Sequence, residues 1–232
     1  MMARHDDRWV MVSKSRTRAP RKSPEERADE IRSAACQVAR VEGLPGLTLR
    51  SVGARAGVAP ALVAHYEPSM DGLVASTFAA ITGAEVDEIT ELIADDPNAT
   101  SKLRNLITTL TEPGRDDVTI VWADAFSLGR VNRPLAAAVR DVMGRWQSLV
   151  SELIIEGVDA GEFVTDDAAD VAWQFLGMID GVNSHALVHY AGAPDRGRLV
   201  RRAMENELGL ERGTLQPGGG QQGGAVGRRA GQ

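Results

Sequence analysis

The stretch from Thr48 to Leu73, TLRSVGARAGVAPALVAHYEPSMDGL, constrains the fold more than any other part of the chain. The Thr48 hydroxyl can cap a short helix that Gly57 ends, because glycine readily adopts the positive φ often needed just past a helix. Pro60 suits a first helical position, so residues 61–66 predict a second short helix. Two short helices joined by a glycine-containing turn are typical of a helix-turn-helix, whose second helix enters the major groove of DNA. An ordinary helical hairpin is the alternative.

Apolar residues at helical spacing predict further helices along the rest of the chain. These cover residues 25–42, 69–95, 99–111, 116–131, 134–160, 166–191 and 195–208. No stretch shows the alternating pattern and turn signals of a β-hairpin. The predicted fold is all-α with about nine helices: three N-terminal helices that include the helix-turn-helix, then about six more.

Composition divides the chain into four segments. Residues 1–24 are polar and basic and predict a disordered arm, which is either a solubilising tail, a start assigned too early, or an arm that touches DNA. We expect residues 25–73 to form the helix-turn-helix domain and residues 74–210 to form a second domain, for which the family resemblance given below implies effector binding and dimerisation. Residues 211–232 are rich in Gly and Gln, which predicts a disordered tail.

The net charge of −6 is unevenly distributed. Residues 1–72 hold 12 Lys and Arg against 9 Asp and Glu, hence +3, and residues 73–232 hold 14 against 23, hence −9. A positive N-terminal part on an acidic body fits a DNA reader carried by a regulatory domain. No run approaches the roughly 18 apolar residues of a membrane span, and no signal-peptide core is present, so we expect a cytoplasmic protein without a membrane partner.

Motifs of catalysis and metal binding are weak. The sequence has no G-x-S-x-G, G-x-G-x-x-G, P-loop or H-E-x-x-H motif, and we expect neither an enzyme nor a cofactor. The single cysteine, Cys36, excludes an internal disulfide and cannot form a zinc site alone. His185 and His189 are four residues apart on an expected helix but lack a third ligand, so a polar stripe in a pocket or interface is favoured over a metal site.

The span from Ile31 to Leu73 resembles the N-terminal DNA-binding domain of TetR-family transcriptional regulators. The matching positions are Ala34, Ala35, Gly43, Thr48, Val52, Ala56, Gly57, Val58, His65, Tyr66, Pro68, Ser69 and Leu73. The phrase from Pro60 to Tyr66 is more similar to the subgroup of the choline-responsive repressor of betaine synthesis. Departures from the family pattern stand at Leu62, Ala64, Glu67 and Met70, and Met70 replaces a lysine that would reach a DNA phosphate.

The resemblance implies a regulator that binds an operator in double-stranded DNA, most simply a repressor released by a small-molecule effector. A helical protein-interaction module with a degenerate helix-turn-helix is the alternative. The expected DNA-contacting residues are Thr48, Arg50, Ala59, Pro60, Ala61, Leu62, His65 and Tyr66. Because residues 59–64 offer almost no side-chain donors, base recognition should rest on His65 and on contact of Ala61 or Leu62 with thymine methyls.

The resemblance also implies a homodimer joined through a four-helix bundle of the last two helices. Their apolar stripes consist of Val171, Phe175, Met178 and Val182, and of Leu199, Ala203, Met204 and Leu208, although an intramolecular core would use the same pattern.

An effector cavity is expected where aromatic residues gather. Seven of the ten aromatic residues lie between Trp122 and Tyr190. The expected ligand-binding residues are Trp122, Asp124, Phe126, Trp146, Trp173, Asp180, His185 and His189. Aromatic faces with carboxylates suit a cation, and the subgroup resemblance points to quaternary ammonium compounds. A neutral apolar metabolite is the alternative ligand, and ordinary core packing is the alternative role of the aromatic residues.

Overall fold

The computed structural model describes residues 22–190 and 195–217, and in these ranges every regular element is a helix. The expected all-α fold is confirmed. The nine α-helices of the described ranges are α1 (Pro24–Glu42), α2 (Leu49–Ala56), α3 (Pro60–Tyr66), α4 (Met70–Ala94), α5 (Ala99–Thr111), α6 (Asp116–Leu128), α7 (Arg133–Asp159), α8 (Ala168–Leu187) and α9 (Gly197–Glu207). A short 3-10 helix, Leu44–Gly46, follows α1 and was not expected.

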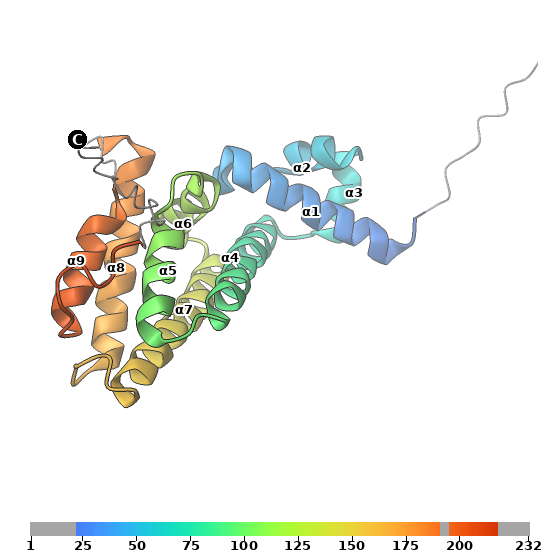
Figure 1. The fold of residues 1–232 in the computed structure, drawn as a ribbon. Helices are drawn as coiled ribbons and strands as arrows, with labels where there is room; N and C mark the ends of the chain where they lie inside the picture. The colour runs from blue at the N-terminus through green and yellow to red at the C-terminus, as the bar shows by residue number, and fades with distance from the viewer. Residues whose placement is uncertain (1–21, 191–194, 218–232) are drawn as a thin grey trace, which may run out of the picture.

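The chain has two parts, which Figure 1 shows side by side. Helices α1 to α3 form a head that projects from a stacked body of α4 to α9. Helix α4 links them, since it packs against α1 of the head and against α7, α5 and α6 of the body. None of the helices in the described ranges is long and apolar enough to cross a membrane.

Local signals build the head. Ser23 caps α1 through a reciprocal pair with Glu26, and Thr48 caps α2 through a reciprocal pair with Ser51. Gly57 ends α2 in the left-handed conformation at φ 66°. The turn into α3 is tight, because a Cβ on Gly53 would lie 2.9 Å from the Val58 carbonyl oxygen. Only glycine fits there without displacing the backbone, which fixes the angle between α2 and α3.

The body is tied together by contacts between distant residues. Glu162, in the turn after α7, accepts hydrogen bonds from the Ala99 and Thr100 amides and so caps the start of α5. Phe163 is 2% exposed and packs onto Gly157, where any Cβ would collide with its ring.

Three expected boundaries are wrong. The arm expected at residues 1–24 already includes the helix cap Ser23 and the first residue of α1, while residues 1–21 lie outside the described ranges. Helix α8 ends at Leu187, not at residue 191, and His189 has φ 54°, outside helical geometry. The expected disordered tail begins too early, because Leu215 is fully buried and its amide donates to Glu205. Residues 218–232 of that tail lie outside the described ranges.

Candidate functional site

The outer surface of α3 is almost without polar side chains. Ala59, Pro60, Ala61 and His65 are exposed, and Leu62 and Tyr66 are half-buried. Val63 is fully buried and anchors the helix to the core. His65 and Tyr66 stand edge to face with ring centroids 5.2 Å apart. On this face His65 is therefore the most accessible hydrogen-bonding side chain.

Helix α2 supplies the cationic side chains next to α3. Arg50, one of the expected DNA-contacting residues, is exposed, and so is Arg55 in the last turn of α2. Arg55 was not among the expected DNA-contacting residues, although a basic residue two positions before the turn glycine could have indicated it. The Thr48 hydroxyl already bonds Ser51 as part of the helix cap, so it is less free to contact DNA.

A cavity of about 50 Å³ lies within the body, among α4, α5, α6, α7 and α8. Its lining consists of Glu85, Leu110, Arg115, Thr119, Trp122, Ala123, Phe126, Met143, Trp146, Leu176, Ile179, Asp180, Asn183 and Ser184. Trp146 is 4% exposed, whereas Phe126 is 42% exposed and reaches solvent. The space is small and opens toward the surface.

Aromatic rings form one wall of this cavity. Trp122 stands edge to face against Phe78, with ring centroids 5.0 Å apart, and lies 5.7 Å from Phe126 at a tilt of 30°. Trp146 joins the lining from α7. Faces of aromatic rings carry negative potential, so this wall can attract a cation.

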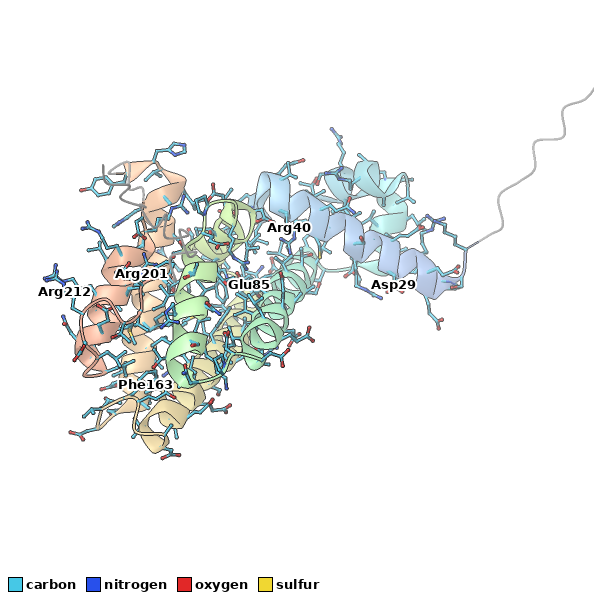
Figure 2. The ribbon with its side chains drawn as sticks, in the orientation of Figure 1. Asp29, Arg40, Glu85, Phe163, Arg201 and Arg212 are labelled. Atoms are coloured by element: carbon cyan, nitrogen blue, oxygen red, sulfur yellow. The ribbon has the colours of Figure 1, made fainter. Side chains whose placement is uncertain are left out.

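Two carboxylates line the cavity, and they differ in their hydrogen-bond and ion-pair partners. Glu85, labelled in Figure 2, accepts a hydrogen bond of 2.7 Å from the Arg115 guanidinium and one of 3.1 Å from the Trp122 ring N–H. Asp180 is half-buried, and no side chain in the described ranges forms an ion pair or hydrogen bond with its carboxylate. Burial raises the pKa of Asp180 to about 6, and the neighbouring charge of Glu85 adds to the rise.

Four of the eight residues expected to bind a ligand line the cavity, namely Trp122, Phe126, Trp146 and Asp180. The other four do not. Trp173 is 70% exposed and lies seven residues before Asp180, about 10 Å along the helix axis. His185 and His189 are exposed, and the early end of α8 separates them. In the described ranges no His, Cys, Asp and Glu side chains gather as a metal site.

Asp124 is the fourth expected residue that does not line the cavity. It bonds instead to the segment between α1 and α2 of the head. Its carboxylate accepts a hydrogen bond of 2.9 Å from the Leu44 amide, and burial raises its pKa. Arg40 at the end of α1, labelled in Figure 2, pairs with Asp117 near the start of α6. Helix α6 therefore lines the cavity with one face and bonds the head with the other.

Glu85 and Arg115 are the most important residues of the cavity that were not expected from the sequence. Glu85 occupies a position in the apolar stripe of α4, between Ile81 and Ile89, and is 7% exposed. A carboxylate within a buried stripe was the available signal, because such a group needs a partner.

The expected dimer stripes mostly face inward. Val171, Phe175, Met204 and Leu208 are buried within the single chain, which corrects their assignment to a dimer interface. Met178, Val182 and Ala203 are half-buried, and Leu199 is 62% exposed. The outer faces of the two helices present Trp173 and Gly177 on α8, and Leu199, Arg202 and Asn206 on α9.

Comparison with known protein families matches a large part of the body. Residues 99–209 match the family model described as the C-terminal domain of BetI-type transcriptional repressors. No curated protein sequence matches the chain significantly.

Solved structures share the fold at low sequence identity. A TetR transcription regulator from Haloarcula marismortui is 20% identical with a TM-score of 0.67, covering 80% of this chain and 97% of its own. A transcriptional regulator from Saccharomonospora viridis in complex with choline is 18% identical with a TM-score of 0.69, covering 78% and 95%. The regulator FadR from Bacillus subtilis in complex with stearoyl-CoA is 19% identical with a TM-score of 0.61, covering 78% and 97%.

The helix-turn-helix head, the helical body and these matches lead to one conclusion. Residues 99–209 belong to the family of C-terminal domains of BetI-type transcriptional repressors, and the described part of the chain has the fold of TetR transcription regulators.

Proposed function

We propose that this regulator is a homodimeric repressor that a small organic cation releases from its operator. The observation that carries the proposal is that the Asp180 carboxylate and the rings of Trp122, Trp146 and Phe126 line one cavity. A carboxylate and aromatic faces together attract quaternary ammonium groups. The choline complex of the Saccharomonospora viridis regulator supports the same ligand class.

The size of the cavity supports a small ligand over an acyl chain. Its volume is about 50 Å³, whereas sites for larger organic ligands enclose roughly 300–1,000 Å³. An acyl chain such as that of stearoyl-CoA would require the body to open far more than a trimethylammonium group does.

Helix α6 is the proposed route from the cavity to DNA. Trp122 and Phe126 line the cavity, while Asp117 and Asp124 on the same helix hold Arg40 and the Leu44 amide. Because the empty cavity is smaller than a ligand, a ligand favours a conformation in which α6 has moved. A ligand shifts a conformational equilibrium by its differential affinity for the two states, and here the second state carries a displaced head.

On the DNA side, we propose that His65 and the apolar surface of Ala61 and Leu62 face base edges. Arg50 and Arg55 on α2 would hold phosphates, with Tyr66 beside them. Two heads are needed for operator affinity, spaced about one helical turn of DNA, roughly 34 Å. The outer faces of α8 and α9, with Trp173 and Leu199, are the proposed dimer surface.

The test measures DNA release and ligand binding on the same protein. Gel shift on the protein's own promoter region, with and without choline, reports release, and tryptophan fluorescence reports binding. We expect Trp122→Ala and Trp146→Ala to weaken both, and the exposed Trp173→Ala to keep wild-type choline affinity. Unchanged affinity and release in the first two variants would place the effector elsewhere.

A second outcome would change the function itself. Failure of the wild-type protein to shift promoter DNA at low salt, while it still assembles with another protein, would favour a helical interaction module.

A further inference from the structure

The two carboxylates in the cavity differ in whether a positive charge already balances them. Glu85 is 7% exposed, and its two oxygens bond the Arg115 guanidinium and the Trp122 ring N–H. Both of its oxygens are therefore engaged, and its charge is balanced by the chain itself. Glu85 serves the structure of the cavity and has little remaining attraction for a ligand.

Asp180 has no such balance within the described ranges. The ionisable groups in the cavity lining are Glu85 from α4, Arg115 just before α6, and Asp180 on α8. Helices α5 and α7 contribute Leu110, Met143 and Trp146, which carry no charge. Near Asp180 on its own helix, the Asn183 side chain is turned to the Leu110 carbonyl, to which it donates a hydrogen bond of 2.9 Å.

The charges of these three groups together give the net charge of the empty cavity. Glu85 at −1 and Arg115 at +1 cancel, so an ionised Asp180 leaves a net charge of −1 in a partly desolvated space. A buried carboxylate without a partner takes up a proton instead of remaining charged. A ligand with one positive charge can replace that proton and leave the cavity neutral.

We propose that Asp180 determines effector specificity by selecting ligands of a single positive charge, and that it releases a proton to solvent when such a ligand binds. The proposal rests on the proposed cation-binding function. In the exchange, the O–H bond of the Asp180 carboxyl breaks, the proton goes to water, and the carboxylate pairs with the ligand cation. No electron transfer or further reactant is involved.

This exchange makes effector affinity depend on pH. With a pKa of about 6 for Asp180 in the empty protein, the ligand competes with a proton below that pH. Affinity should be about tenfold weaker at pH 5 than at pH 8, because roughly ten in eleven empty molecules are protonated at pH 5. Between pH 7 and pH 8 affinity should be nearly constant.

The experiment is calorimetry of choline binding to the full chain between pH 5 and pH 8. Two buffers with different ionisation enthalpies at each pH give the number of protons released, expected to be about one at pH 5 and near zero at pH 8. The neutral carbon isostere 3,3-dimethyl-1-butanol should bind at least tenfold more weakly than choline at pH 8, with no proton release.

Variants separate the charge of Asp180 from its shape. Asp180→Asn should bind choline at least tenfold more weakly at pH 8, and its affinity should no longer depend on pH. Asp180→Glu should keep the pH dependence. The matched control is Asp166→Asn, an exposed carboxylate before α8, which should behave as wild type. Circular dichroism confirms that each variant is folded.

The outcomes distinguish the two proposals. Choline binding that is independent of pH, without proton release at pH 5, would overturn the role of Asp180 and leave the cation-responsive function standing. An Asp180→Asn variant with wild-type affinity at pH 8 would do the same. If choline and larger quaternary ammonium ions fail to bind at millimolar concentration at every pH, both proposals are wrong.

Discussion

The head and the cavity are built by opposite means. The head consists of residues close in sequence, and each acts on its immediate neighbours, since Thr48 caps a helix, Gly57 ends it and Pro60 starts the next. The cavity instead gathers side chains from Glu85 to Ser184 on five helices. A region built from local signals keeps its shape through its own sequence, whereas a region built from distant residues depends on how helices pack. The cavity is therefore the part that a ligand can reshape.

The largest expected effect comes from a substitution that disrupts the turn between α2 and α3 and leaves the cavity unchanged. Gly53→Ala places a Cβ 2.9 Å from the Val58 carbonyl oxygen, so the turn must open at a cost of about 2–3 kcal/mol. We expect operator binding to be lost in gel shift and choline affinity to stay within about twofold of wild type. The control is Gly57→Ala, which meets no atom within 4 Å and carries only the strain of φ 66°, about 1 kcal/mol.

The next effect acts on the cavity and leaves the head unchanged. The pKa of Asp180 is about 6 in the folded protein against 3.8 for an ordinary aspartate. The folded state thus binds more protons than the unfolded state between these values, and the wild-type protein loses stability as pH rises from about 4 to about 6. Asp180→Asn removes this titration and should be more stable by about 2 kcal/mol at pH 7.5.

The measurement is urea unfolding at pH 4 and pH 7.5. At pH 4 the variant and the wild type should be nearly equal in stability, because both side chains are then neutral. A variant less stable than wild type at pH 7.5 would contradict the cost assigned to the buried carboxylate.

A smaller effect lies at the contact between the two regions. Asp124→Ala removes the acceptor of the Leu44 amide without touching the cavity lining. We expect choline affinity and operator affinity each to change by less than about threefold, while the coupling free energy between them falls by about 1 kcal/mol. The coupling is measured as the ratio of operator affinities with and without saturating choline. A ratio equal to that of wild type would show that Asp124 does not contribute to the coupling between choline binding and operator binding.

The smallest effect concerns base reading by the head. Replacing thymine with uracil in the operator removes only the methyl group that Ala61 and Leu62 are proposed to contact. Each contacted methyl should contribute about 0.8 kcal/mol, a change of about fourfold in affinity. Gel shift with uracil placed one position at a time measures this, and uracil in the flanking DNA is the control. Full affinity for an operator substituted throughout would show that the methyl groups are not read.

The same contrast explains which predictions from sequence succeeded. Helices α2 and α3 followed from Thr48, Gly57 and Pro60, whose roles depend on neighbouring residues. Trp122, Trp146 and Asp180, expected together at an effector site, line one cavity, and their binding of a ligand stays a prediction. Asp124 does not line the cavity. Residues two apart on a helix point about 200° away from each other, so Asp124 lies on the face of the helix opposite to Trp122.

The remaining misses required knowledge of packing. Glu85 and Trp122 are 37 residues apart, and no local pattern relates the carboxylate to the ring N–H that it accepts from. Phe175 and Met204 lie on amphipathic helices, and their pattern is the same whether the apolar face meets the same chain or a second copy. Only the packed structure places them inside the single chain.

The hydrogen bond from Leu44 to Asp124 also bears on how such regulators can be recombined. Its donor is a backbone N–H, which every residue except proline supplies, and the neighbouring Gly43 is required because a Cβ there would collide with the Asp124 carboxylate. A foreign helix-turn-helix that keeps this glycine and places an amide after it can therefore make the same bond. Replacing the whole head, from α1 to the end of α3, by such a domain would redirect the body to new operators and make it an interchangeable sensor module.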